Sequence, residues 1–404
     1  MPVTSASQNK PQTAPQRRGN EHAGRPFLGL IDAVLVPDPT TFDFDGAIAE
    51  SDAWALWTWM SRDVAPDLMR PDLSPDDPAA REALDQAMPE ILQRSRDVVN
   101  AAVADANPEA ERRLIVQVGG ERPYSRMGVL RNALKCRHLL EKSQSFGRAT
   151  NALTDEAALT MALQSMPLND HAVTALLMQG AMGQIGNPAR LMQAVIRIAG
   201  DATEKAIVRA GFGPLVDAIF SHAQAQIPAL QQHGAFADID MVCRAVDRFH
   251  RLMRSVMGFV ELNRLSRWSS IAAGLTTTVS ELVEPKLKDV GPSINLALRR
   301  HSGTDRVDPD QLLAALNGCY VLATVRDCRD SLALNALFDQ TWAQVGQALE
   351  IHVQRNLELF RSNPTDRVTG QRLDAAIKMA ELRFNGEYAE VLRRARDSAE
   401  RRVS

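Results

Sequence analysis

Apolar residues recur at helical spacing over most of the chain after about residue 79. The most regular stretch covers residues 240–267, where the apolar positions fall within one broad sector at about 100° per residue. Basic residues occupy the opposite side, as expected for a helix that buries one face. Short connections predict that consecutive helices pack as antiparallel neighbours. Further helices are predicted at 269–283, 286–300, 309–326, 331–361 and 371–402.

Before this region, the stretch 191–219 has the pattern of three helices separated by two short turns. Gly200 and Gly211 each follow an apolar periodic segment, where glycine readily takes the left-handed conformation that ends a helix. Asp201 is the predicted N-cap of the middle helix, and Pro214 suits the first turn of the third. The sequence therefore predicts a helix–turn–helix–turn–helix unit.

The segment AIVRAGFGPLV at residues 206–216 resembles an armadillo-type helical repeat. The resemblance lies in an apolar pair, an Ala-Gly corner and a Pro-Leu-Val opening of the next helix. It implies a solenoid of stacked repeats that binds protein segments in a groove. No second copy stands out at a fixed period, so an isolated helical corner in an ordinary α-helical domain remains the alternative.

The region before residue 79 carries a tryptophan-rich pattern. Residues 46–64 are predicted to be helical, and Trp59 falls off the apolar face. The residues that share this face are Ile48, Trp54, Trp57 and Met60. One interpretation is a helix docked on the core. The other is an anchor for a protein partner, because tryptophan is favoured at binding hot spots. The candidate anchor residues are Trp54, Trp57 and Trp59.

Two short apolar runs are ambiguous. Residues 27–36 are a strand or a docking segment, and LIVQV at 114–118 is the best strand candidate, with a helix end as the alternative. One short strand cannot form a sheet. The sequence therefore predicts an all-α fold, either a multi-helix bundle or an irregular α-solenoid.

The predicted organisation has three parts. A disordered tail covers residues 1–26, and an N-terminal segment at 27–78 holds the tryptophan helix and a Pro-rich linker. A helical domain covers residues 79–404, and a further boundary near residue 234 or residue 303 stays open.

Composition is consistent with a helical protein and limits its partners. Of the 404 residues, 45% are apolar and only 5% aromatic, which favours helices over sheets. The net charge of −3 supplies no overall field for nucleic acid or membrane, so neither is expected as a partner. No apolar run reaches the roughly 18 residues of a transmembrane helix. The four cysteines are too few for a disulfide framework and are interpreted as buried thiols of a cytoplasmic protein.

The N-terminal tail suggests a second functional hypothesis. Residues 1–26 are rich in Ser, Gln, Asn and Pro, and they lack the apolar core of a cleaved signal peptide. This composition resembles the polar, uncleaved N-terminal signals of type III secreted effectors. The resemblance implies a bacterial effector, or a secretion-associated protein, that is exported through this tail.

The sequence FDFDG at residues 42–46 resembles the first motif of the haloacid dehalogenase-type phosphotransferases. The resemblance implies that Asp43 is the nucleophile and Asp45 the general acid/base, with Mg²⁺ balancing the charge. Three features differ from the family: a Pro-rich stretch replaces the buried strand before the motif, Ala47 stands where threonine is usual, and the rest of the chain offers almost no strands for the parallel sheet of that fold. The alternative interpretation is that Asp45 or a neighbour caps the tryptophan helix.

No other motif for catalysis or metal binding is present, so no metal and no cofactor are predicted. The clearest charged feature is an arginine stripe on the predicted helix 240–267. It is interpreted either as a solvated face with salt bridges or as a binding surface for an acidic partner. The stripe comprises Arg244, Arg248, Arg251 and Arg254.

A large helical surface without a converging catalytic set favours binding over chemistry, although fold alone does not decide function. The leading hypothesis is a non-catalytic helical scaffold or adaptor for protein–protein contact. The secreted effector and the phosphotransferase are the alternatives.

Overall fold

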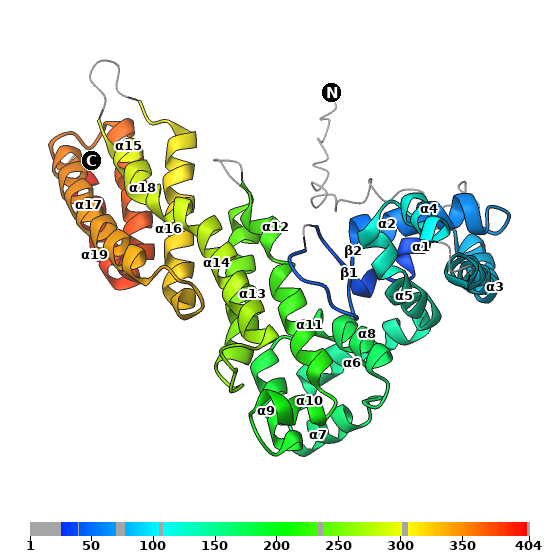
Figure 1. Cartoon of the computed structure of the whole chain (residues 1–404). Helices are drawn as coiled ribbons and strands as arrows, with labels where there is room; N and C mark the ends of the chain where they lie inside the picture. Colours follow the sequence, from blue (N-terminus) through cyan, green and yellow to red (C-terminus); the bar gives the residue numbers. More distant parts are fainter. Residues whose placement is uncertain are drawn as a thin grey trace, which may run out of the picture. The chain divides into compact units, whose positions relative to one another are not determined.

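The computed structural model describes residues 26–38, 40–69, 77–104, 108–232, 237–300 and 306–401, with the side chains of Pro26 and Phe27 left aside. Helices make up most of these residues, which confirms the all-α prediction (Figure 1). Within the described ranges, strands are limited to β1 (Leu35–Val36) and β2 (Ile48–Ala49), which pair with each other. The predicted disordered tail falls almost wholly outside the described residues, so the export hypothesis rests on its composition.

The chain divides into two compact units. The first combines Met1–Leu35 with Glu50–Arg137, and the second combines Val36–Ala49 with His138–Ser404. The sequence-based division between residues 78 and 79 therefore falls inside the first unit. The short segment 36–49, in which residue 39 is not described, belongs to the second unit although the chain on both sides of it belongs to the first. We call residues 36–49 the crossing segment.

The first unit is a group of helices around α2 (Glu50–Trp59), which a π-helical turn, Met60–Val64, continues. Helix α2 packs on α5, and α3 packs on the π-helical turn, on α4 and on α5. The proposed strand 114–118 is instead the end of α4, as the alternative interpretation had it, because Gly119 and Gly120 take positive φ angles that end the helix. The remaining helices of the unit are α1 (Pro26–Gly29), α3 (Pro78–Ala104), α4 (Pro108–Gln117) and α5 (Glu121–Lys135).

The first part of the second unit contains α11 (Gly213–Gln224), in which nearly every residue is buried and which packs on α8, α10, α13 and α14. The predicted helix–turn–helix–turn–helix unit is confirmed, with Gly200 and Gly211 at positive φ. Thr203, and not Asp201, is the N-cap of α10, because its hydroxyl accepts the Ala206 N–H. The membership of this unit in an armadillo-type array stays a prediction. The other helices of this part are α6 (Arg137–Ala152), α7 (Glu156–Gln164), α8 (His171–Met182), α9 (Pro188–Ala199), α10 (Glu204–Arg209) and α12 (Ile227–Leu230).

The second part of this unit corrects three predicted helix boundaries. The single helix predicted at 240–267 ends at Met257, and a new helix begins at Arg267 after the N-cap Ser266. Pro285 does not end that helix, and 371–402 is two helices because Asn385 caps a new one. The elements are α13 (Ile239–Met257), α14 (Arg267–Lys288), α15 (Val290–Leu298), α16 (Pro309–Cys328), α17 (Asn335–Ser362), α18 (Arg367–Arg383) and α19 (Gly386–Glu400).

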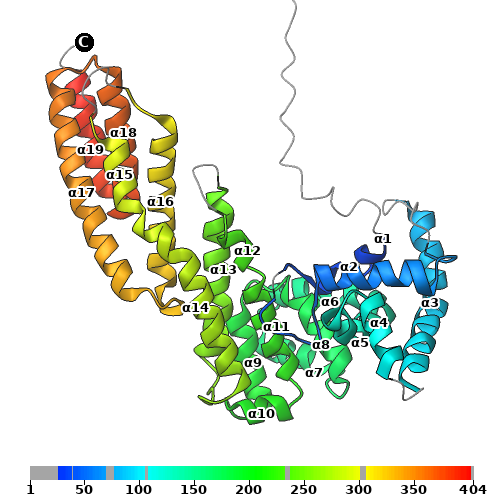
Figure 2. The same ribbon diagram turned by 45° about the horizontal axis from the view of Figure 1, so that its top comes forward.

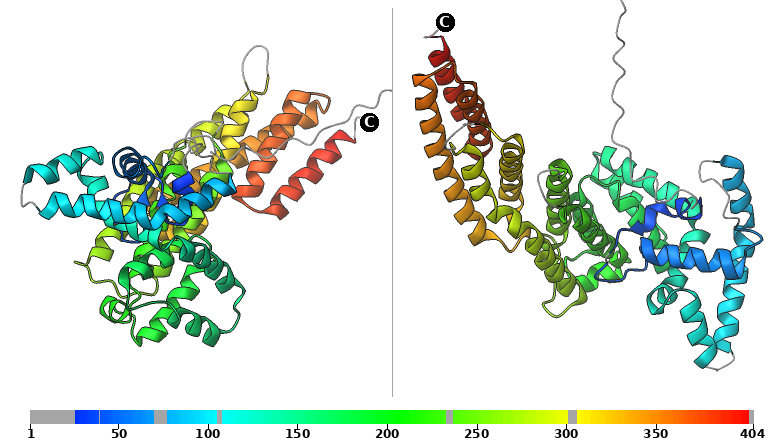
Figure 3. Two further views of the ribbon diagram at one scale, coloured as in Figure 1. Left: turned by 90° about the vertical axis from the view of Figure 1, so that its right-hand side faces the viewer. Right: turned by 90° about the horizontal axis from the view of Figure 1, so that it is seen from above.

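Helices α15 to α19 lie side by side as a bundle (Figure 2). The long helix α17, drawn in orange, runs along this bundle and packs on α18, α15 and α19 (Figure 3). Buried apolar side chains of the second unit form one continuous core, to which the crossing segment contributes Val36, Phe44 and Ala47.

Candidate functional site

The three tryptophans of α2 occupy different environments. Trp59, predicted to lie off the buried face, is only 1% exposed, whereas Trp54, predicted on that face, is 36% exposed. The prediction was wrong because the buried face runs through Asp52, Leu56 and Trp59, which are spaced i, i+4, i+7. Asp52 is a charged residue with 4% exposure, so the pattern of apolar residues in the sequence did not reveal this buried face.

Asp52 is stabilised in its buried position by an ion pair. Arg122 of α5 donates from Nε to the Asp52 carboxylate at 3.0 Å. A buried carboxylate needs such a partner, because desolvation of an unpaired charge is costly. The pair therefore fixes the rotation of α2 on α5 and, with it, the direction of each tryptophan.

Trp54 lies on the surface of the first unit and is stacked on Trp57. Their ring centroids are 5.3 Å apart and the ring planes differ by 7°. Because Trp57 is 8% exposed, it forms a fixed base that orients the outer indole. Trp54 is thus a rigid apolar projection, and it is the member of the predicted anchor set that a partner can reach.

The arginine stripe of α13 does not form a uniform basic face. Arg248 is half-buried and donates to the carbonyl oxygens of Ile185 (2.7 Å) and Met182 (3.0 Å), which satisfies the C-terminal end of α8. Burial, followed by the charge of Arg251, lowers the pKa of its guanidinium. Two other members form i,i+4 ion pairs with neighbours on the same helix: Arg244 with Asp240, and Arg251 with Asp247.

Arg254 is the remaining member of the stripe. No ion pair of Arg254 is found among the described residues, and its charge lowers the pKa of His250, for which burial is the larger cause. The stripe therefore divides into one structural contact, two local pairs and one surface charge.

Asp43 and Asp45 lie on the crossing segment against helices of the second unit. The Asp43 carbonyl oxygen accepts from Arg267 at 3.1 Å. The Asp45 carboxylate lies 4.0 Å from His171, and the side chains of Asp45 and His171 are both more than half exposed. The resemblance to phosphotransferases implies a strand that ends directly before Asp43, but in the described residues β1 ends at Val36. Asp45 does not cap α2, because that helix begins at Glu50.

A buried carboxylate that the sequence did not single out joins α11 to α14. Asp217 accepts from Arg267 Nη1 (2.8 Å) and from the indole N–H of Trp268 (2.9 Å). Arg267 in turn contacts the crossing segment through the Asp43 carbonyl oxygen. A lone aspartate within an apolar helix was the available signal, but its partners are 50 or more residues away.

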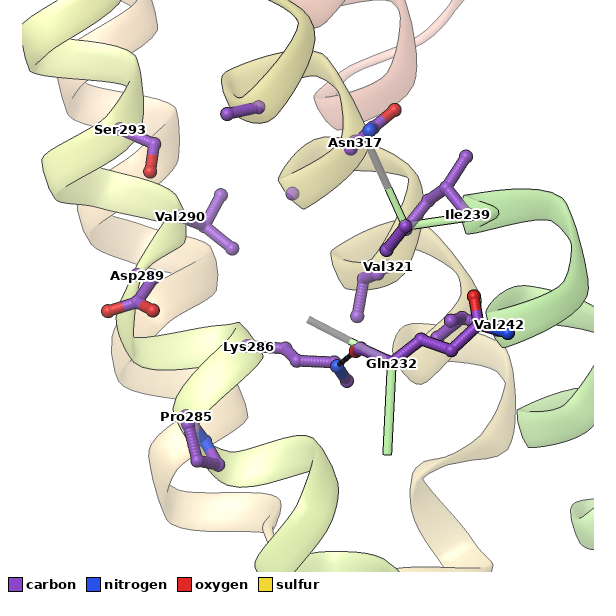
Figure 4. Close-up of a pocket in the computed structure, with 13 residues that line it drawn as sticks. Gln232, Ile239, Val242, Pro285, Lys286, Asp289, Val290, Ser293, Asn317 and Val321 are labelled. Carbon is purple, nitrogen blue, oxygen red and sulfur yellow. Dashed lines mark hydrogen bonds between the residues drawn. The ribbon is translucent and has the colours of Figure 1, made fainter. Parts of the chain in front are cut away.

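A cavity of about 210 Å³ lies between α13, the α14–α15 junction and α16 of the second unit (Figure 4). Its walls are mostly apolar, and Lys286 projects across it toward Gln232, whose backbone carbonyl oxygen accepts from the ammonium group. Burial lowers the pKa of this lysine. No pattern in the sequence indicated the cavity, because its walls come together only through the packing of three separate segments.

The described residues contain neither a metal site nor a membrane-spanning helix. No group of three or more His, Cys, Asp or Glu side chains there is arranged to hold a metal ion. No helix in those ranges has the length and apolar character needed to cross a membrane. His22, His233 and His301 lie outside the described ranges. No disulfide joins the cysteines of the described ranges, Cys136, Cys243, Cys319 and Cys328, and burial raises the pKa of Cys319 to about 12.

No family model, no curated protein and no solved structure matches the chain. The case for function therefore rests on the surface and the cavity described above.

Proposed function

We propose that the protein is a non-catalytic helical scaffold or adaptor that binds a protein partner through the exposed face of α2. The observation that supports this proposal is the Trp54 indole, which is 36% exposed and stacked on the buried Trp57. Tryptophan is enriched among the few residues that dominate binding energy at protein interfaces.

Pre-organisation of Trp54 strengthens the argument. Association normally loses the rotamer freedom of each side chain that becomes fixed. The parallel stack at 5.3 Å and the ion pair of Asp52 with Arg122 already restrict the indole before a partner arrives. Small side chains lie at the neighbouring exposed or half-exposed positions of α2, so the indole stands above its surroundings: Ser51, Ala55 and Thr58.

The test uses a photo-crosslinking residue at Ser51, one turn before Trp54, in the full chain expressed in its own host. We expect a discrete adduct with one protein, and Trp54→Ala should remove it while the melting temperature changes little. Val391→Ala in α19 is the matched control, because Val391 is an exposed apolar residue at a distant position in the sequence. An adduct that is equally strong in Trp54→Ala and in the control would refute the proposal.

A further inference from the structure

The cavity between α13, α15 and α16 combines apolar walls with one cationic group. Its apolar lining includes Ile239 and Val242 from α13, Val290 from α15 and Val321 from α16 (Figure 4). Gly318 contributes to the shape, since a Cβ atom there would come within 3.3 Å of the Val290 side chain. The apolar walls of the site thus come from α13, α15 and α16, and Gln232 contributes from the segment between α12 and α13.

Lys286 is the only Lys or Arg among the described lining residues. It is half-buried, and its ammonium group donates to the Gln232 carbonyl oxygen. Among the described residues, no carboxylate lies within ion-pair distance of it, whereas Lys288, two residues on, pairs with Glu284 at 2.5 Å. An ammonium group has three donors, so two remain for a ligand.

The other polar groups at the cavity limit the charge that a ligand can carry. Asp289 is exposed, and its carboxylate points away from Lys286 (Figure 4). Ser293 and Asn317 supply neutral hydrogen-bonding groups at the lining. One ammonium group beside neutral polar groups matches a single negative charge, because a buried charge is costly unless it is paired. A doubly charged phosphate would leave charge uncompensated.

The volume of the cavity and its apolar walls limit the size and character of the rest of the ligand. The cavity volume of about 210 Å³ is below the roughly 300–1,000 Å³ of clefts that hold drug-sized ligands. The valine and isoleucine side chains favour an apolar body. We propose that this cavity binds a small monocarboxylic acid, with its carboxylate on Lys286 and an aromatic or branched aliphatic body between Val242, Val290 and Val321. This inference is independent of the proposed partner-binding role of Trp54.

The test measures binding of benzoate to the full chain by ligand-observed NMR and titration calorimetry. Benzamide and benzylammonium are the comparison probes, because they keep the ring and replace the negative charge by a neutral or a positive group. We expect saturable binding of benzoate, at least tenfold tighter than binding of either comparison probe.

Variants then locate the site. Lys286→Met should weaken benzoate binding at least tenfold, and Lys286→Arg should retain most of it. Lys288→Met is the matched control on the same helix and should bind as the wild type does. Ala314→Phe should abolish binding by filling the cavity while Lys286 stays in place. Absence of saturable benzoate binding, or equal binding in Lys286→Met and Lys288→Met, would overturn the proposal.

Discussion

His222 shows how burial makes a single residue sensitive to pH. Its ring is half-buried and donates from Nε2 to the Gln179 carbonyl oxygen at 2.9 Å. Burial, with a smaller contribution from the charge of Arg248, lowers the pKa of His222 from its ordinary 6.5 to about 4. The folded protein thus keeps this ring neutral at pH values where the unfolded chain binds a proton.

The free energy of unfolding should therefore fall as the pH drops from about 6.5 to about 4, where the folded state also becomes protonated. We expect His222 to account for about 2 kcal/mol of this loss, since one pKa unit corresponds to about 1.4 kcal/mol and the ring is only half-buried. Urea unfolding at pH 7 and pH 4.5 measures it. His222→Gln removes the titration and should lose less stability over this range; an equal loss in both proteins would contradict the assignment.

Individual residues also show where the sequence was insufficient. The three tryptophans were found as a cluster, but their burial was assigned wrongly for Trp54 and Trp59. The helix buries Asp52 because Arg122, 70 residues later, neutralises it. Hydrophobic periodicity treats every aspartate as a surface residue, so it cannot find a buried ion pair whose second member lies on another helix.

At the scale of elements, the two turns that flank α10 require glycine for different reasons. Both have positive φ angles, 76° at Gly200 and 86° at Gly211. A Cβ atom at Gly200 would meet no atom within 4 Å, whereas at Gly211 it would lie 2.9 Å from the Leu168 Cβ atom. The first position thus needs glycine for its backbone alone, and the second also needs the space.

Alanine substitutions separate these two effects. Gly200→Ala should lower the free energy of unfolding by about 1 kcal/mol, the cost of a left-handed conformation with a side chain. Gly211→Ala should lower it by about 3 kcal/mol, because steric overlap adds to that cost. Thermal and denaturant unfolding of both variants measure the difference. Equal destabilisation would show that Leu168 moves aside.

Most helices could be predicted from periodicity, but several ends could not. The predicted helix 240–267 was too long because Val260 continues the apolar pattern. Val260 is indeed buried (6% exposed), but it lies beyond the end of α13. Hydrogen bonds from the Asn263 N–H (3.0 Å) and the Ser266 hydroxyl (2.5 Å) to Glu204 hold this connection in a non-helical form. Such tertiary contacts leave no periodic trace in the local sequence.

At the scale of the whole molecule, the crossing segment makes the chain pass from the first unit to the second, back to the first, and again to the second. It is fixed to the second unit by Thr41, whose N–H and hydroxyl donate to Gln224 at 2.5 and 2.6 Å, and by Gly46. A Cβ atom at Gly46 would overlap the Ala175 carbonyl oxygen. The chain therefore passes between the units at residues 35–36, 49–50 and 137–138.

Separate expression of residues 26–137 and 138–401 tests this connection. The first fragment carries the crossing segment, so we expect the two fragments to associate. Gly46→Ala in the first fragment should weaken association at least tenfold, or about 1.4 kcal/mol. Gly29→Ala is the matched control, because a Cβ atom there meets nothing within 4 Å. Calorimetric titration gives the affinities, and equal values for the two variants would argue against the contact.

During synthesis on the ribosome, the crossing segment is made long before the helices that it packs against. It leaves the exit tunnel before any helix of the second unit, yet Asp43 is separated from its partner Arg267 by 224 residues. At roughly 5–20 residues per second, that separation corresponds to about 10–45 s. Phe44 and Ala47 have no core to enter until α8 and the later helices of the second unit have been made. The nascent chain thus exposes a short apolar segment that a chaperone can hold until the helices that bury it have been made.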